Sequence, residues 1–142
     1  MKLVVIGCGR VGSAVARDLA EDGWDVTAVD EQEEALARLG ARWSGGFVVG
    51  HGMDAEILRK AGVPDADAVV VATSGDNTNL VIGQVVAKRY AIDCVVVRVL
   101  DPARADFYAK RGMQTVCPTQ TAIESLAAAV RASQKQTQEV PA

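Results

Sequence analysis

Three glycines near the amino terminus form the pattern GxGxxG. Gly7, Gly9 and Gly12 lie in the run GCGRVGS, which follows the apolar segment KLVVIG and precedes a helical pattern. In this context the first glycine permits a tight turn, the second lets a pyrophosphate approach the backbone, and the third lets the helix and strand pack closely. Phosphate is then attracted by the free N–H groups and positive dipole end of the helix. The loop therefore predicts a nucleotide site.

A carboxylate occurs at the distance that such a loop requires. Asp30 ends the predicted second strand, about 20 residues after the third glycine. There it can accept hydrogen bonds from both ribose hydroxyls, and it would repel a 2′-phosphate. Glu31 and Gln32 bring no arginine to bind such a phosphate. An acid at the start of the next helix is the structural alternative, but the glycine loop upstream favours NAD or a plain adenine nucleotide over NADP.

Two arginines are candidates for an anion contact. Arg10 lies between Gly9 and Gly12, where a guanidinium can bind phosphate through two parallel hydrogen bonds. The alternative is a solvated arginine on the first helical turn, a position where the helix dipole disfavours a cation. Arg98 lies late in the apolar run VVVRVLDP, where a charge is costly unless it is paired. Its partner is either an acidic side chain or the nucleotide.

Polar residues also follow two other predicted strands. His51, the only histidine, lies in GHGMD after the third strand, as an adenine contact or as a plain loop residue. A catalytic base is the least favoured alternative, because the sequence offers it no partner. Thr73, Ser74 and Gly75 follow the fourth strand and should pass close to the ribose and pyrophosphate. We assign no catalytic and no metal-binding residue. The candidate nucleotide-binding residues are Gly7, Cys8, Gly9, Arg10, Val11, Gly12, Asp30, Glu31, His51, Thr73, Ser74, Gly75 and Arg98.

The segments that must position these residues alternate between strand and helix. Apolar strand patterns cover residues 2–7, 24–30, 46–50, 67–73, 93–100 and 113–118, with helical patterns between them. This alternation predicts an α/β, Rossmann-like doubly wound fold, with a parallel six-stranded sheet and helices on both faces. The candidate residues then fall in loops at the carboxyl edge of the sheet, where ligands bind at the reversal of strand order.

The carboxyl-terminal region divides into a helix and a tail. The last helix should begin near Thr121, because Thr121 and Glu124 match a T-x-x-E capping box. The polar run SQKQTQEVPA after it lacks a pattern and suggests a frayed tail or linker. We therefore expect a Rossmann-like nucleotide-binding domain over residues 1–133 and a polar tail or linker over residues 134–142.

Composition excludes several classes of protein. The chain has 142 residues, enough for one compact domain, and 49% of them are apolar. Its net charge of −3 argues against a nucleic-acid surface. No apolar run reaches the length of a membrane span, and KLVVIG is too short for a signal peptide. These features predict a cytoplasmic protein without direct membrane insertion.

The cysteines do not suggest a metal site or a disulfide. Cys8, Cys94 and Cys117 are odd in number and form no CxxC pair. We expect them to pack as small apolar side chains. A redox role for Cys8, beside a helix amino terminus that lowers a thiol's pKa, is the less favoured alternative.

Taken together, the motifs resemble those of the RCK or KTN (TrkA-N) nucleotide-binding domain. GCGRVGS, VDE, GHGMDAEILRKAGV, ADAVVVATSGDNTN, VVVRVLDP and GMQTVCP carry the resemblance, over roughly residues 2 to 131. It implies a regulatory module that binds NAD(H) or an adenine nucleotide (ATP, ADP or AMP) and controls a membrane potassium transporter or channel from the inner face of the membrane. It also implies that Arg10 can reach a phosphate across a dimer. Some relatives have a metal-binding glutamate where Thr119 follows Pro118, so no metal site is implied.

Two helical segments indicate self-association. NLVIGQVVAKRY is apolar nearly all round and should be buried on more than one side, and AIESLAAAVRAS offers a flat, alanine-rich face. We expect a homodimer or a higher homo-oligomer. The alternative function is an NAD-dependent oxidoreductase or its cofactor-binding domain. An enzyme of that class needs a positioned acid or base, and His51 falls on the adenine side, so we favour the regulatory module.

Overall fold

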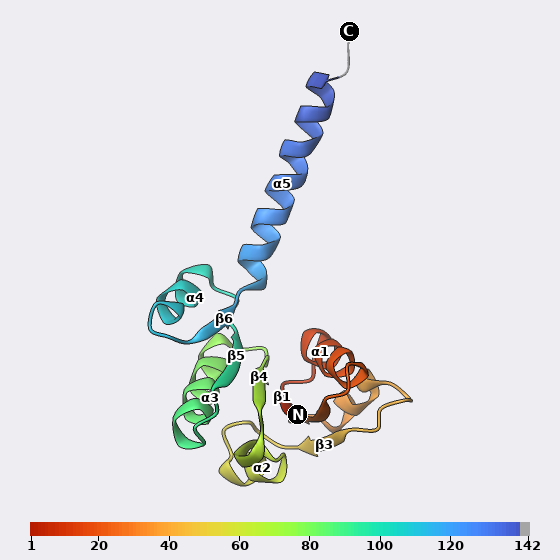
Figure 1. The fold of residues 1–142 in the computed structure, drawn as a ribbon, viewed down its shortest axis with the longest axis vertical. Helices are drawn as coiled ribbons and strands as arrows, with labels where there is room; N and C mark the ends of the chain where they lie inside the picture. Colours follow the sequence, from red (N-terminus) through yellow and green to blue (C-terminus); the bar gives the residue numbers. More distant parts are fainter. Residues whose placement is uncertain (140–142) are drawn as a thin grey trace.

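A single parallel sheet forms the centre of the molecule (Figure 1). The computed structural model describes the backbone of residues 1–139 and the side chains of residues 1–135. The strands follow the order β3-β2-β1-β4-β5-β6, so the order reverses between β1 and β4. This arrangement confirms the predicted Rossmann-like fold. The strands are β1 (Lys2–Ile6), β2 (Asp25–Asp30), β3 (Gly46–Val49), β4 (Ala68–Val71), β5 (Cys94–Arg98) and β6 (Gln114–Val116).

Helices cover both faces of the sheet. Figure 1 shows α3 and α4 on one side of the strands and α1 on the other, while α5 projects away from the sheet. α1 and η1 share one buried cluster with β1 and β2, and α2, α3 and α4 share the other. The helices are α1 (Arg10–Glu21), η1 (Glu33–Leu39), α2 (Ala55–Lys60), η2 (Val63–Asp65), α3 (Asp76–Arg89), α4 (Pro102–Ala109) and α5 (Pro118–Glu139).

The central strand β1 explains why its sequence is continuously apolar. Leu3 and Val5 pack into the cluster that contains Ala16 of α1, whereas Val4 and Ile6 pack into the cluster on the opposite face. All four strand side chains are buried. A parallel strand covered on both faces needs apolar residues at successive positions rather than at alternate ones. The buried strand delivers the glycine loop to the carboxyl edge.

The long helix α5 differs from the prediction at both ends. It begins at Pro118, and the Thr121 hydroxyl donates to the Cys117 carbonyl, 3.2 Å away. The capping box is therefore wrong: Thr121 lies inside the helix, and Glu124 accepts from the Gln120 side chain. Residues 134–139, expected as tail or linker, continue the helix, because the glutamine, lysine and glutamate in this run favour helix. Residues 140–142 lie outside the described residues.

One face of β5 and β6 is only partly covered, because α1 and η1 pack over the other half of the sheet. Cys94, Val96 and Arg98 alternate onto this face, and Val116 is the register partner of Arg98. Cys94 is exposed and Val116 is 51% exposed. The expected burial of Cys94 is therefore wrong. In residues 1–139, no helix combines the length and apolarity needed to cross a membrane.

Candidate nucleotide-binding site

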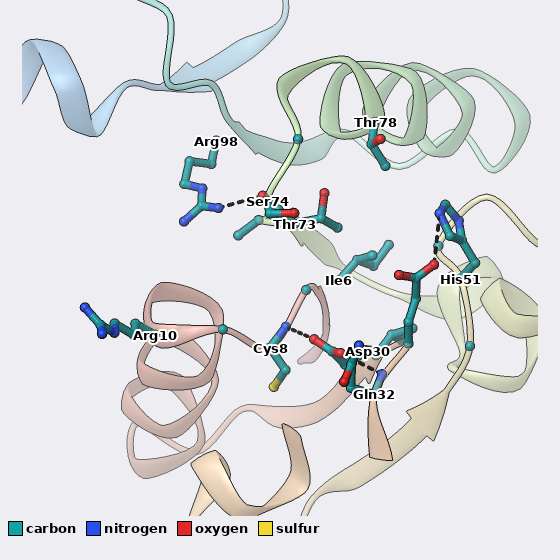
Figure 2. Close-up of a pocket in the computed structure, with 18 residues that line it drawn as sticks. Ile6, Cys8, Arg10, Asp30, Gln32, His51, Thr73, Ser74, Thr78 and Arg98 are labelled. Atoms are coloured by element: carbon teal, nitrogen blue, oxygen red, sulfur yellow. Dashed lines mark hydrogen bonds and ion pairs between the residues drawn. The ribbon is translucent and has the colours of Figure 1, made fainter. Parts of the chain in front are cut away.

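A cavity of about 540 Å³ opens at the carboxyl ends of β1, β2 and β4, where the strand order reverses. We call it the carboxyl-edge cavity (Figure 2). Its volume lies within the range of small-molecule sites. The residues that line it are Ile6, Gly7, Cys8, Gly9, Arg10, Val29, Asp30, Glu31, Gln32, Gly50, His51, Gly52, Ala72, Thr73, Ser74, Gly75, Thr78 and Arg98.

Most of the predicted site residues meet in this cavity. Of the candidates, all except Val11 and Gly12 line it. Val11 lies on the first turn of α1, and 43% of the residue is exposed. Gly12 lies on the same turn, beneath the glycine loop, where it contacts Gly7. The helical turn carries both residues away from the opening, so the loop motif extends beyond the cavity lining.

Some lining residues were not predicted. They are Ile6, Val29, Gln32, Gly50, Gly52, Ala72 and Thr78. Most of them directly flank a strand end that the sequence had already indicated. Thr78 comes from the first turn of α3 instead, where helical periodicity turns it toward the loop after β4. The first six residues lie at or near strand ends, and this proximity is the sequence signal that could have identified them.

The three glycines of the loop differ in why glycine is needed at their positions. Gly7 adopts a left-handed backbone with φ of 97°, and its N–H donates to the Val29 carbonyl at 2.8 Å. A Cβ atom on Gly12 would lie 1.8 Å from the Gly7 carbonyl oxygen. A Cβ atom on Gly9 would meet no atom within 4 Å. The fold itself therefore requires the first and third glycines, whereas the second borders open space.

The Asp30 carboxylate joins the end of β2 to the glycine loop. One of its oxygens accepts from the Cys8 backbone N–H at 2.8 Å, and the other accepts from the Gln32 N–H at 2.9 Å. Figure 2 shows both contacts. A carboxylate has about four lone-pair positions, so each oxygen retains capacity for another donor. Asp30 can thus hold the loop and accept from a ligand hydroxyl simultaneously.

Cys8 is buried beneath the loop and is unsuited to redox chemistry. Burial, with the negative charge of Asp30 as a smaller cause, raises the pKa of the Cys8 thiol to about 11, against a lowering effect of Arg38. The thiol therefore stays protonated at neutral pH and is a poor nucleophile. Arg38 also donates to the Cys8 carbonyl at 3.3 Å. This support of the loop from η1 was not predicted.

His51 and Glu31 form a polar pair at one rim of the cavity. The distance from His51 Nε2 to Glu31 Oε1 is 3.2 Å, and the Met53 N–H donates to His51 Nδ1 at 3.1 Å. Because Nδ1 accepts, the proton of the ring lies on Nε2 and is donated to Glu31. His51 is therefore oriented by two contacts. In this arrangement both ring nitrogens of His51 are engaged, so neither is free to act as a base.

The two predicted arginines behave differently. Arg98 donates from Nη2 to the Thr73 carbonyl at 2.6 Å, and its buried Nε has no partner. Among the described side chains, no carboxylate forms an ion pair with Arg98. Of the two partners predicted for this arginine, the acidic side chain is therefore not found among these residues. Figure 2 shows Arg98 beside Thr73 and Ser74, whereas the exposed Arg10 side chain points away from Cys8 and Asp30. As the first residue of α1, Arg10 extends outward from the helix end.

The carboxyl-edge cavity thus offers hydrogen-bond donors on one side and acceptors on the other. Donors come from Arg98 and the amino terminus of α1, and acceptors come from Asp30 and Glu31. In residues 1–135, no three His, Cys, Asp or Glu side chains gather closely enough to hold a metal ion. Chemically, the arrangement suits a ligand with phosphate at one end and hydroxyls nearer the other.

Comparison with known sequences identifies the family. The model of the TrkA-N domain matches residues 3–119. A Streptomyces coelicolor protein named Trk system potassium uptake protein TrkA is 39% identical over 116 residues, which are 82% of this chain and 52% of that protein. A TrkA homolog of Methanothermobacter thermautotrophicus is 32% identical over 123 residues, covering 86% of this chain and 56% of the other. The chain spans about half the length of these curated relatives.

Solved structures share the fold at lower sequence identity. The RCK domain of GsuK superposes with a TM-score of 0.80 and 22% identity, over 94% of this chain and 28% of that one. The Shewanella denitrificans Kef CTD in its AMP-bound form gives 0.73 and 24% identity, over 97% and 92% of the two chains. These likenesses support the fold, and the family match covers most of the sequence. The chain therefore belongs to the TrkA-N domain family.

Proposed function

We propose that this chain binds NAD(H) or an adenine nucleotide (ATP, ADP or AMP) in the carboxyl-edge cavity and thereby regulates potassium transport by a membrane partner. The convergence of Gly9, Asp30 and Arg98 on one cavity supports the proposal most strongly. Gly9 leaves open space beside the backbone, and Arg98 has an unpaired buried nitrogen. A phosphate-bearing ligand would fill the space beside Gly9 and would accept a hydrogen bond from the unpaired nitrogen of Arg98.

Each part of a nucleotide has a matching group in the cavity. The phosphates bind over Gly9 at the amino terminus of α1, where backbone N–H groups and the helix dipole favour negative charge. Arg98 supplies further donors from the loop side. The ribose hydroxyls donate to Asp30, and adenine lies toward His51. Because Asp30 and Glu31 are both acidic, a 2′-phosphate is repelled, which disfavours NADP.

The names of similar proteins support a regulatory role. The relatives in Streptomyces and Methanothermobacter are named as Trk system potassium uptake proteins. Structures of the GsuK channel are described as bound to NAD or to ADP. Within the described residues, His51 is engaged by Glu31 and Met53, so the cavity presents no free histidine base. These observations favour a regulator over an NAD-dependent oxidoreductase, which is the alternative function.

Regulation would act through a shift in populations. A ligand changes a conformational equilibrium only by its difference in affinity for the two states. Here the nucleotide would stabilise one arrangement of the regulator, which the membrane partner senses. The chain would act at the inner face of the membrane without inserting into it.

Potassium uptake tests this function directly. In the host cell, deletion of the chain should change the initial rate of rubidium uptake from low-potassium medium by about fivefold or more, the usual size of an allosteric coupling. Asp30→Ala should abolish the response of that rate to the cellular nucleotide pool. An unchanged rate after deletion, together with oxidation of NADH by the purified chain and a carbonyl substrate, would favour the oxidoreductase.

We also propose that the chain forms a homodimer or higher homo-oligomer through α5. This helix projects away from the sheet (Figure 1). Ile123, Leu126 and Val130 recur at helical spacing along one side of it, and their exposed fractions are 52%, 70% and 62%. On α3, Val81 and Val85 on the outer face are exposed in the single chain, so the expected burial of this helix on more than one side would require a partner chain. Such contiguous apolar exposure is typical of protein interfaces.

Substitution of one α5 residue tests self-association. Leu126→Glu should convert an oligomeric wild-type chain to monomer, because a buried unpaired carboxylate is costly at an interface. Static light scattering after gel filtration gives the mass. Ala128→Glu is the matched control, because Ala128 is exposed on the opposite side of the same helix and should leave the mass unchanged. A monomeric wild-type chain would contradict the proposal.

A further inference from the structure

Asn79 is a buried amide on the first turns of α3, beside but not lining the carboxyl-edge cavity. Only 1% of the residue is exposed. Its Oδ1 accepts from the backbone N–H of Thr73 at 2.9 Å and from the Thr73 hydroxyl. Its Nδ2 donates to the Thr73 carbonyl and to the Arg98 carbonyl, both at 3.0 Å. The amide thus binds the backbone at two places. One is Thr73, just after β4, and the other is Arg98, at the end of β5.

This side chain uses its complete hydrogen-bonding capacity. A primary amide offers two donors and two acceptor lone pairs, and Asn79 has four partners. The last register pair between β4 and β5 is Val71 with Val97. Beyond that pair, the Asn79 amide connects the two strand ends where their ladder stops. It therefore fixes the loop that lines the cavity.

Asn79 contacts the backbone of Arg98 and shares an acceptor with its guanidinium. The Arg98 backbone carbonyl accepts directly from Asn79 Nδ2. The Arg98 guanidinium donates to the Thr73 carbonyl at 2.6 Å, and this carbonyl also accepts from Asn79. Because Arg98 has no carboxylate partner among the described side chains, the Thr73 carbonyl is the contact that orients its guanidinium. The same carbonyl is held by the Asn79 amide.

We propose that Asn79 is the positioning residue that holds Arg98 and the Thr73 loop in place for the phosphate end of a nucleotide. The inference rests on the nucleotide-binding function proposed above and extends it to a residue that does not line the cavity. Asn79 acts through Arg98 and Thr73, so it should contribute to the affinity for the phosphate groups and not to the affinity for adenosine. A preorganised guanidinium binds phosphate without the cost of being ordered at the moment of binding.

Aspartate at position 79 is the sharpest test, because it has the shape of asparagine without the two donors. In Asn79→Asp the carboxylate still accepts from Thr73, but its second oxygen faces the carbonyls of Thr73 and Arg98, which are 3.0 Å from the present nitrogen. The oxygens repel one another, and the new carboxylate competes for the Arg98 guanidinium. The variant should therefore release Arg98 from its position.

The experiment is calorimetric titration of the full chain with ADP and with adenosine. Asn79→Asp should weaken ADP by about tenfold or more, as expected for a lost charged hydrogen bond, and leave adenosine unchanged. Asn77→Asp is the matched control. Asn77 is exposed on the same helix and accepts from Arg104 through an oxygen that aspartate retains, so this variant should bind both ligands as the wild type does.

Each result has a separate meaning. Equal weakening of ADP and adenosine, or no weakening of either, would overturn the positioning role while leaving nucleotide binding intact. Failure of the wild type to bind ADP, NAD or any other adenine nucleotide would instead overturn the proposed function. If Asn79→Asp does not fold, the side-chain amide NMR signals of Asn79 in the wild type decide. These signals should shift when ADP is added but not when adenosine is added. Signals that stay unchanged with both ligands would overturn the positioning role of Asn79.

Discussion

Replacement of Asp30 by alanine should weaken every ribose-bearing nucleotide by about 100-fold, since hydrogen bonds to a charged group contribute about 1.5–3 kcal/mol each. Two losses combine in this variant. The ribose hydroxyls lose their acceptor, and the N–H groups of Cys8 and Gln32 lose the oxygens that fix the loop at 2.8 and 2.9 Å. The phosphate-binding backbone is thereby loosened along with the ribose contact.

Calorimetry on three variants separates these contributions. Asp30→Asn keeps an acceptor oxygen but loses the charge, so its affinity should lie between those of the wild type and the alanine variant. Glu21→Ala is the matched control, because this exposed acid at the end of α1 does not line the carboxyl-edge cavity. Its effect should be much smaller. Unchanged affinity in Asp30→Ala would mean that the ribose does not bind at Asp30.

Alanine at the second and third glycines of the loop should have opposite consequences. In Gly12→Ala the new methyl would lie 1.8 Å from the Gly7 carbonyl oxygen. The backbone must then move, at a cost of about 3 kcal/mol or more. In Gly9→Ala the methyl meets no atom within 4 Å, and the residue's φ of −77° suits alanine. This variant should fold normally and yet lose affinity, because the methyl occupies the space beside the phosphate-binding backbone.

Thermal unfolding and nucleotide titration of the same two variants distinguish fold from function. Gly12→Ala should lower Tm clearly, whereas Gly9→Ala should keep the wild-type Tm and weaken nucleotides by about tenfold or more, as a steric loss at a packed contact implies. A Gly9→Ala chain with wild-type affinity would show that no ligand approaches the loop at this point.

The sequence was most informative where local rules and the fold agree. The apolar strands, Gly7 and Gly12 each follow from requirements of a covered parallel sheet, and the structure places them as predicted. The meeting of Asp30 with the loop could also be predicted. Parallel strands end at a common edge, so residues far apart in sequence must converge there.

Other features depend on contacts that no spacing rule specifies. The partner of Arg98 is the Thr73 carbonyl and not an acid, and the role of Asn79 appears only when β4 and β5 lie side by side. Cys94 is exposed because α1 and η1 do not cover β5, which the apolar run around it cannot reveal. α5 begins at Pro118 because proline suits a first helical position, and this signal outweighs the apparent capping box at Thr121.

Titration of the wild-type chain with NAD, NADH, ATP, ADP, AMP and NADP tests nucleotide binding most directly. The geometry of the carboxyl-edge cavity predicts saturable binding of NAD(H) or an adenine nucleotide, one molecule per chain, with NADP at least about tenfold weaker because Asp30 and Glu31 repel its 2′-phosphate. Absence of measurable binding for all six compounds would contradict the nucleotide-sensing account.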